Sequence, residues 1–157
     1  MPSLMNHHLA KKPETSGPPS ILITDDDSFC REILRVFLES YGFHCLEAQD
    51  GGEALAIVRT SSICFMVTDF HMPYMNGCEL LEQLCREDCS RPPTVLVTGD
   101  LTDQIQQRAL QTGAITVLEK PFDQKNLLNI ICRSMDISNV SPGKTISALA
   151  TLPNALS

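Results

Sequence analysis

Five short runs rich in Val, Ile, Leu and Phe recur along this chain, each separated from the next by a longer stretch with helical periodicity. The runs cover residues 20–24, 43–48, 63–68, 94–98 and 114–118. Runs of this composition are typical of strands buried on both faces, as in a parallel sheet with helices on each side. The alternation predicts an α/β fold of five consecutive βα units, in which a doubly wound parallel sheet is the middle of three layers.

Several helix ends are marked in the sequence. Asp50-x-x-Glu53 and Asn76-x-x-Glu79 resemble capping boxes and predict the starts of the second and third helices. The first helix has an apolar stripe, and a glycine follows where a left-handed residue commonly ends a helix. That stripe and its glycine comprise Ile33, Leu34, Phe37, Leu38, Tyr41 and Gly42. The fourth helix, at about 102–112, has few apolar residues and is expected to be the least firmly packed.

Composition restricts the class of protein. The 157 residues suffice for one domain, predicted at 20–135, with flexible tails at 1–19 and 136–157. A net charge of -7 argues against a direct nucleic-acid surface, which requires clustered Lys and Arg. Apolar runs fall far short of the roughly 20 residues of a membrane span, and no secretory signal is evident. A cytoplasmic protein is therefore expected.

Seven cysteines without a CxxC pair suggest neither a disulfide framework nor a zinc site.

Polar side chains stand at the carboxyl ends of four predicted strands. They are Asp25, Asp26 and Asp27 after the first strand, Asp69 after the third, Thr98 ending the fourth and Lys120 after the fifth. Parallel sheets bind ligands at this edge, where loops from several strands converge. Each residue alone is uninformative, since an acidic triplet after a strand is usually a solvated turn, and Asp27 is expected to be a helix N-cap.

Together, these side chains indicate one chemistry. Converging carboxylates repel each other unless a cation lies among them, and Mg²⁺ accepts a few carboxylates while bridging to phosphate oxygens. A lysine ammonium and a threonine hydroxyl suit the remaining oxygens of a phosphoryl group. The set therefore predicts phosphoryl transfer to a carboxylate.

Four segments carry a resemblance to a known family. ILITDDDS at 21–28, VTDFHMPYMNG at 67–77, VLVTGD at 95–100 and LEKPF at 118–122 closely resemble the motifs of response-regulator receiver domains. The resemblance covers about residues 20–135. It implies a flavodoxin-like (βα)5 sandwich with strand order 2-1-3-4-5, and a phosphoprotein of two-component or phosphorelay signalling. Such a domain catalyses only its own phosphorylation and dephosphorylation.

The resemblance also implies residue roles. Asp69 would be the phospho-acceptor and also a Mg²⁺ ligand. Asp26 would be a direct Mg²⁺ ligand, Asp25 a ligand through water and His71 a ligand through its backbone carbonyl. Thr98 and Lys120 would hold the phosphoryl oxygens. His71 and Asp100 lie where side chains tune attack of water on the acyl phosphate. The peptide bond between Lys120 and Pro121 would be cis, and Val117 replaces the aromatic residue of the usual switch.

The family resemblance implies partners of two kinds. A sensor histidine kinase or a histidine phosphotransfer protein would supply the phosphoryl group, and a downstream target protein would receive the signal or the phosphate. Direct contact with nucleic acid or a membrane is not expected. The stretch after the last predicted helix is too short for an output domain, so a single-domain receiver is expected.

Two other classes remain open at this point. A phosphohydrolase of the haloacid dehalogenase type would use Asp25 as nucleophile in a DxDx(T/V) motif, but Phe29 stands at its third position. A pseudo-receiver would be an interaction module that is never phosphorylated, although all the functional positions are intact here. A phosphoryl donor separates the first alternative by the residue that becomes labelled, and Mg²⁺ titration separates the second.

Overall fold

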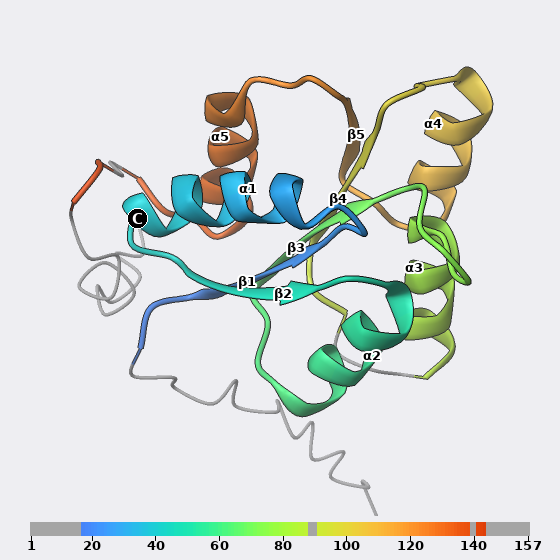
Figure 1. The fold of residues 1–157 in the computed structure, drawn as a ribbon, viewed down its shortest axis with the longest axis horizontal. Coiled ribbons are helices and arrows are strands. Elements are labelled where there is room, and N and C mark those ends of the chain that lie inside the picture. Colours follow the sequence, from blue (N-terminus) through green and yellow to red (C-terminus); the bar gives the residue numbers. More distant parts are fainter. Residues whose placement is uncertain (1–16, 88–90, 139–140, 144–157) are drawn as a thin grey trace, which may run out of the picture.

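The computed structural model describes residues 17–87, 91–138 and 141–143. Within them, five parallel strands in the order β2-β1-β3-β4-β5 alternate with five helices along the chain (Figure 1). The strands are β1 (Ser20–Thr24), β2 (His44–Ala48), β3 (Phe65–Asp69), β4 (Thr94–Thr98) and β5 (Thr116–Glu119). The helices are α1 (Ser28–Ser40), α2 (Gly51–Thr60), α3 (Gly77–Arg86), α4 (Asp103–Gln111) and α5 (Gln124–Ser134). The predicted doubly wound fold and its strand order are confirmed.

Three strands begin later than their sequence patterns predict. The backbone N–H of Phe43 donates to the carbonyl of Leu38, and that of Ala114 donates to the carbonyl of Ala109. These two residues therefore close the ends of α1 and α4 and do not join β2 and β5. β3 is shifted toward its carboxyl end and includes Asp69, because this residue pairs with Val97 of β4.

Each helix in the described part of the chain begins after a residue whose side chain accepts a backbone N–H of the first turn. The capping residues are Asp27, Asp50, Asn76, Thr102 and Asp123. A cap of this kind contributes about 1 kcal/mol to stability. The predicted starts of the second and third helices are confirmed, and Asp27 is an N-cap as expected.

The helix ends use glycine where the backbone requires it. Gly42 after α1 has φ +92° and Gly113 after α4 has φ +94°, both in the left-handed region that side chains disfavour. The sequence predicted Gly42 as the residue after the first helix, and Gly113 directly follows the predicted end of the fourth helix at about 112.

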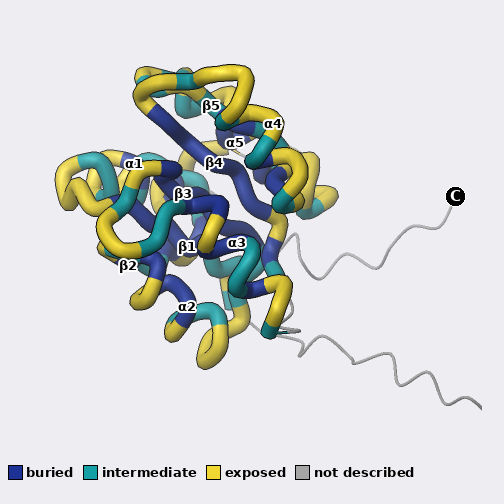
Figure 2. The backbone as a smooth tube through the Cα atoms, turned by 90° about the vertical axis from the view of Figure 1, so that its right-hand side faces the viewer, coloured by how far each residue is buried: buried dark blue, intermediate teal, exposed yellow. Residues whose placement is uncertain are grey.

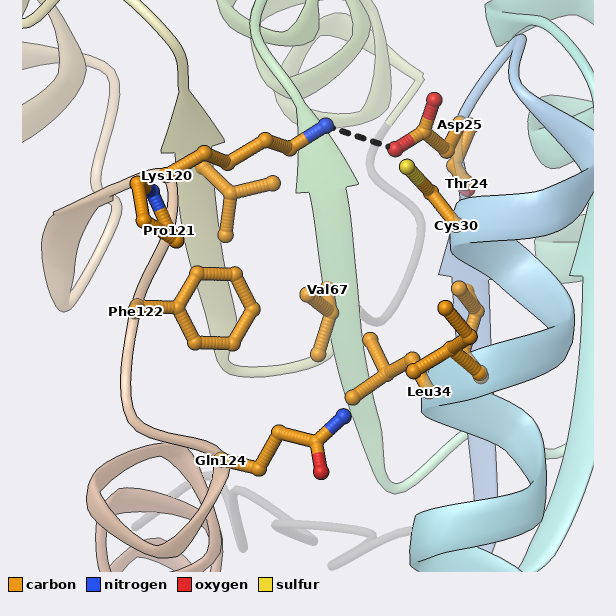
Figure 3. A pocket seen from close by; sticks show the side chains of 12 residues that line it. Thr24, Asp25, Cys30, Leu34, Val67, Lys120, Pro121, Phe122 and Gln124 are labelled. Carbon is orange, nitrogen blue, oxygen red and sulfur yellow. Dashed lines mark hydrogen bonds and ion pairs between the residues drawn. The ribbon is translucent and has the colours of Figure 1, made fainter.

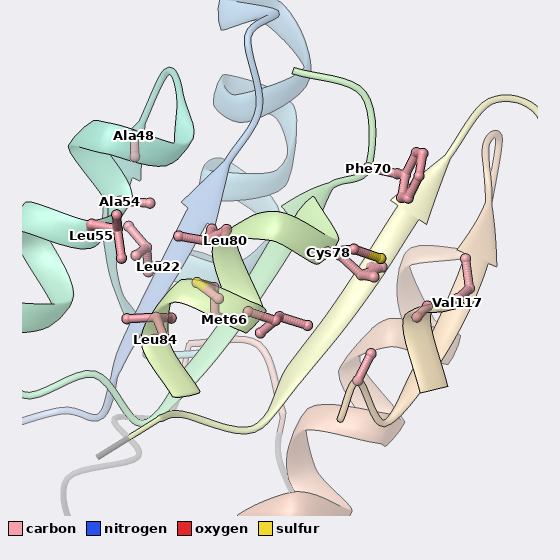
Figure 4. Close-up of a cluster of buried hydrophobic side chains, with 14 residues drawn as sticks. Leu22, Ala48, Ala54, Leu55, Met66, Phe70, Cys78, Leu80, Leu84 and Val117 are labelled. Carbon is pink, nitrogen blue, oxygen red and sulfur yellow. The ribbon is translucent and has the colours of Figure 1, made fainter. Parts of the chain in front are cut away.

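The sheet separates two hydrophobic clusters, because successive strand residues face opposite sides. Ile21, Ile23 and Val67 point toward α1 and α5, whereas Leu22 and Met66 point toward α2, α3 and α4. Figure 2 shows the central strands as buried and the outer helix surfaces as exposed. Figure 4 shows the second cluster, in which Leu80 and Leu84 of α3 contact the sheet. These clusters fix the strand ends that present the polar residues.

Two helices bury less than their patterns predict. Ile33, assigned to the apolar stripe of α1, is 43% exposed, because the buried face of this helix is centred on Leu34 and Leu38. In α4 only Ala109 is buried, and Leu110 is 50% exposed. The prediction that the fourth helix is the least firmly packed is therefore confirmed.

Some predictions concern residues at the chain ends. The predicted tails lie largely outside the described residues, which omit 1–16, 139–140 and 144–157. Among the residues that are described, no helix has both the length and the apolar character needed to cross a bilayer.

Candidate functional site

Three carboxylates meet at the carboxyl edge of the sheet. Asp25 and Asp26 follow β1, Asp69 ends β3, and one carboxylate oxygen of each lies within 4.8 Å of the others. Asp25 and Asp69 are buried, whereas Asp26 is exposed. The structure therefore brings together the three acids that the sequence predicted as metal ligands.

Lys120 compensates part of this charge. Its Nζ lies 2.8 Å from Asp25 Oδ2 and 3.1 Å from Asp69 Oδ2. Figure 3 shows the lysine side chain extending from the segment after β5 to the Asp25 carboxylate. Burial lowers the pKa of Lys120, but the hydrogen bond to Asp25 and the charges of Asp69 and Asp25 outweigh this and raise its pKa above the ordinary value. Lys120 is therefore a fixed cation between two buried acids.

The surroundings of Asp69 change the pKa of its carboxyl group. Its burial and the nearby charge of Asp25 raise the pKa of Asp69, against the opposing effects of Lys120 and of a hydrogen bond from the His71 backbone N–H at 3.3 Å. Its own backbone is closely packed: a Cβ built at Gly77 would lie 2.7 Å from the Asp69 carbonyl oxygen and 2.6 Å from Leu96. Glycine at 77 thus lets α3 start directly against the candidate acceptor.

The acidic loop after β1 is held by its own neighbours. The Asp27 N–H donates to Asp25 Oδ1 at 2.9 Å, and Arg31 Nη1 donates to the Asp25 carbonyl at 2.6 Å. Arg31 also bonds Glu47 of β2 through Nε at 3.3 Å. Sequence reasoning missed Arg31, because nothing in the sequence distinguishes this arginine from others on helix surfaces.

Thr98 and Lys120 are connected through their backbones. The Lys120 N–H donates to the Thr98 carbonyl at 2.7 Å, which places the two residues on adjacent strand ends beside Asp69. The peptide bond between Lys120 and Pro121 is cis, as predicted. The Thr98 hydroxyl itself is bonded to Asp100 at 3.2 Å, and Asp100 bonds the His71 ring at 2.8 Å.

The residues present fit a hard divalent cation. Three carboxylates converge while a single ammonium contacts two of them, so negative charge remains in excess. A hollow of about 300 Å³ adjoins the cluster, and Asp26, His71 and Asn76 are among its lining residues. Oxygen ligands beside an open volume suit Mg²⁺, which retains several of its waters. The structure also has an apolar groove of about 400 Å³ between α1 and the start of α5, and Asp25 and Lys120 are among its lining residues.

Comparison with known proteins identifies the family. The model of the response regulator receiver domain matches residues 21–132. The chain belongs to the response-regulator receiver family. Receiver domains generally bind Mg²⁺ at an acidic pocket, accept a phosphoryl group and interact with histidine kinases or phosphotransfer proteins. The dehalogenase-type and pseudo-receiver alternatives are not favoured by these findings.

The receiver has relatives in bacteria, archaea and yeast. It is 34% identical over 109 residues to the chemotaxis protein CheY-3 of Vibrio cholerae, covering 68% of this chain and 84% of that protein. The peroxide stress-activated histidine kinase mak2 of Schizosaccharomyces pombe is 31% identical over 118 residues, or 70% of this chain. The receiver spans only 5% of that kinase. A CheY-like receiver from Methanospirillum hungatei superposes with a TM-score of 0.71 and 28% identity, covering 76% of this chain and 95% of that structure.

Proposed function

We propose that Asp69 accepts the phosphoryl group and that the domain signals by this modification and has no separate substrate. The main support is the close approach of four side chains, since the three carboxylates could share one metal ion and Lys120 is bonded to two of them. The side chains are those of Asp25, Asp26, Asp69 and Lys120. The hydrogen bond of 3.1 Å from Lys120 Nζ to Asp69 Oδ2 supports the proposal, because it brings a positive charge to the carboxylate that would accept the phosphoryl group. The test is incubation with acetyl phosphate and Mg²⁺, with intact mass as the readout. One added phosphoryl group is expected.

In this proposal Asp26 and Asp69 would hold Mg²⁺ directly, Asp25 would hold it through water, and His71 would hold it through its backbone carbonyl. When bound, the metal would neutralise charge on the transferring phosphoryl oxygens. Lys120 would hold one of these oxygens and Thr98 another. Asp25 would position Lys120 through its 2.8 Å bond, and Arg31 would fix the loop that carries Asp25.

Magnesium should stabilise the folded protein, because ligands that bind only the native state shift the unfolding equilibrium. At a concentration 100 times its Kd the expected gain is about 2.7 kcal/mol, seen as a rise in Tm. Asp26→Ala should abolish most of this rise. Asp103→Ala, which removes an exposed acid at the start of α4, should keep it. Equal responses of wild type and Asp26→Ala would place the metal elsewhere.

The phosphoryl donor is proposed to be a histidine kinase or a histidine phosphotransfer protein, and docking would occur around the acceptor edge. Two exposed aromatic residues flank that edge: Phe29 in the first turn of α1 is 67% exposed, and Tyr74 between β3 and α3 is 100% exposed. Tyr74 has φ +68°, a backbone conformation that is costly for a side chain of this size.

We propose residues 20–135 as the receiver unit and the cytoplasm as its location.

Output is proposed to pass from Thr98 to α4. Phosphorylation adds charge beside Thr98, and drawing its hydroxyl inward would pull on the β4–α4 loop. Val117 is a buried residue of the cluster beside α4, so position 117 carries no aromatic ring that could change its rotamer. The displacement would therefore involve the backbone of residues 99–112.

A beryllofluoride complex should accordingly change amide hydrogen exchange mainly in residues 99–122. Thr98→Ala should suppress this change while leaving Asp69 able to accept a phosphoryl group. Changes limited to the acidic loops, with 99–122 unaffected, would contradict conformational output and favour a domain that passes phosphate onward.

A further inference from the structure

Asp100 joins two loops at the edge of the site. Its Oδ1 accepts hydrogen bonds from His71 Nε2 at 2.8 Å and from the Thr98 hydroxyl at 3.2 Å. Its backbone N–H donates to Thr98 Oγ1 at 3.3 Å. Because a carboxylate can only accept, the His71 ring must carry a proton on Nε2 in this arrangement. The bonds from His71 and Thr98 lower the pKa of Asp100, so the carboxylate is ionised at neutral pH.

The Thr98 hydroxyl has a single proton to donate. In this structure that proton is directed to Asp100. The oxygens of a phosphoryl group on Asp69 also accept hydrogen bonds, so they would require the same proton. Thr98 therefore cannot fully satisfy Asp100 and a phosphoryl group at once.

We propose that Asp100 is a positioning residue, which holds the Thr98 hydroxyl in the resting state and must release it when a phosphoryl group binds. This inference rests on the proposed roles of Asp69 and Thr98, and it concerns the regulation of that site. His71 strengthens the hold, since its bond orients the Asp100 carboxylate. The side chains of His71 and Asp100 are 58% and 69% exposed, so the competition is modest and reversible.

The charge of Asp100 could weaken the binding of a phosphoryl group by a second mechanism. A carboxylate near the site repels an incoming phosphoryl dianion through space, whether or not it is bonded to Thr98. The two routes differ in one requirement, because only the proposed route needs the Thr98 hydroxyl. A double-mutant cycle between the two residues therefore separates them.

The experiment measures beryllofluoride affinity in saturating Mg²⁺ by calorimetry. The proteins are the full chain as wild type, Asp100→Ala, Thr98→Ala and the double variant. With Thr98 present, Asp100→Ala should raise the affinity about five-fold, as expected for releasing one ordinary hydrogen bond. In the Thr98→Ala background the gain should be below about two-fold. Asp103→Ala removes the same charge at the start of α4 without touching Thr98, and should leave the affinity within about two-fold.

An equal gain in both backgrounds would overturn the proposal in favour of through-space repulsion. No gain in either background would also overturn it. Removal of an exposed side chain such as Asp100 is not expected to unfold the domain, and thermal unfolding of each variant checks this. A wild type that binds no beryllofluoride would instead overturn the acceptor role of Asp69, and this inference with it.

Discussion

Asp69→Asn should take up no phosphoryl group from acetyl phosphate under conditions in which the wild type is modified. The amide oxygen of asparagine is a poor nucleophile, although the side chain keeps the size of aspartate. Packing around it is close, since Asp69 is buried and α3 starts against its backbone, so a substitution of equal volume is the appropriate one. Intact mass spectrometry measures the result.

The wild-type adduct should be labile to hydroxylamine, as an acyl phosphate is. Asp25→Asn is the matched comparison, because it removes the other buried acid bonded to Lys120. That variant should be phosphorylated slowly, yet with the adduct still on Asp69. Full labelling of Asp69→Asn, with the adduct on Asp25, would contradict the assignment and revive the dehalogenase-type reading.

Lys120→Met should lower the free energy of unfolding of the metal-free protein by about 3 kcal/mol. Methionine keeps much of the lysine stem but removes the charge that lies between Asp25 and Asp69, whose side chains are only 7% and 11% exposed. Two buried carboxylates would then lack a countercharge and keep only hydrogen bonds from backbone N–H groups. The measurement is urea unfolding in EDTA.

Repeating the urea unfolding with Mg²⁺ in place of EDTA separates the loss of charge compensation from the loss of packing. Mg²⁺ should return part of the lost stability to Lys120→Met, because a cation among the carboxylates replaces the missing ammonium. Because the pKa of Lys120 is raised in the folded protein, its stabilisation is fully present below about pH 10 and is lost as pH rises above that value. Measurements near pH 7.5 therefore include the whole stabilisation by Lys120.

Lys125→Met, which removes an exposed lysine of α5, should change stability by less than about 0.5 kcal/mol. Equal effects of the two substitutions would mean that Lys120 does not compensate the acids.

The fold was predictable because its local and global signals agree. Apolar runs indicated the strands, and the side chains of Asp50 and Asn76 marked helix starts that the structure retains. The errors at the starts of β2 and β5 arose where two elements compete for one residue. Phe43 and Ala114 look like strand residues by composition, but their N–H groups serve the preceding helix, and no periodicity can reveal that choice.

The sequence predicted which residues form the candidate site but not the hydrogen bonds between them. Parallel strands place Asp25, Asp69 and Lys120 at one edge, so their convergence follows from topology. The bonds made by Arg31 and Asp100 do not, because they depend on the direction of long or exposed side chains across loops. Sequence reasoning placed Asp100 near the phosphate but could not show that it is bonded to Thr98.

The weak packing of α4 has a consequence for the energetics of signalling. Among the helices described, α4 buries one residue whereas α3 buries five. The free energy of local unfolding is small for such an element, so thermal motion samples displaced positions of α4 more often than of its neighbours. A partner that recognises a displaced α4 would find that conformer already present at low population. The phosphoryl group then needs to supply only a small bias, and the remaining helices can keep their packing throughout the cycle.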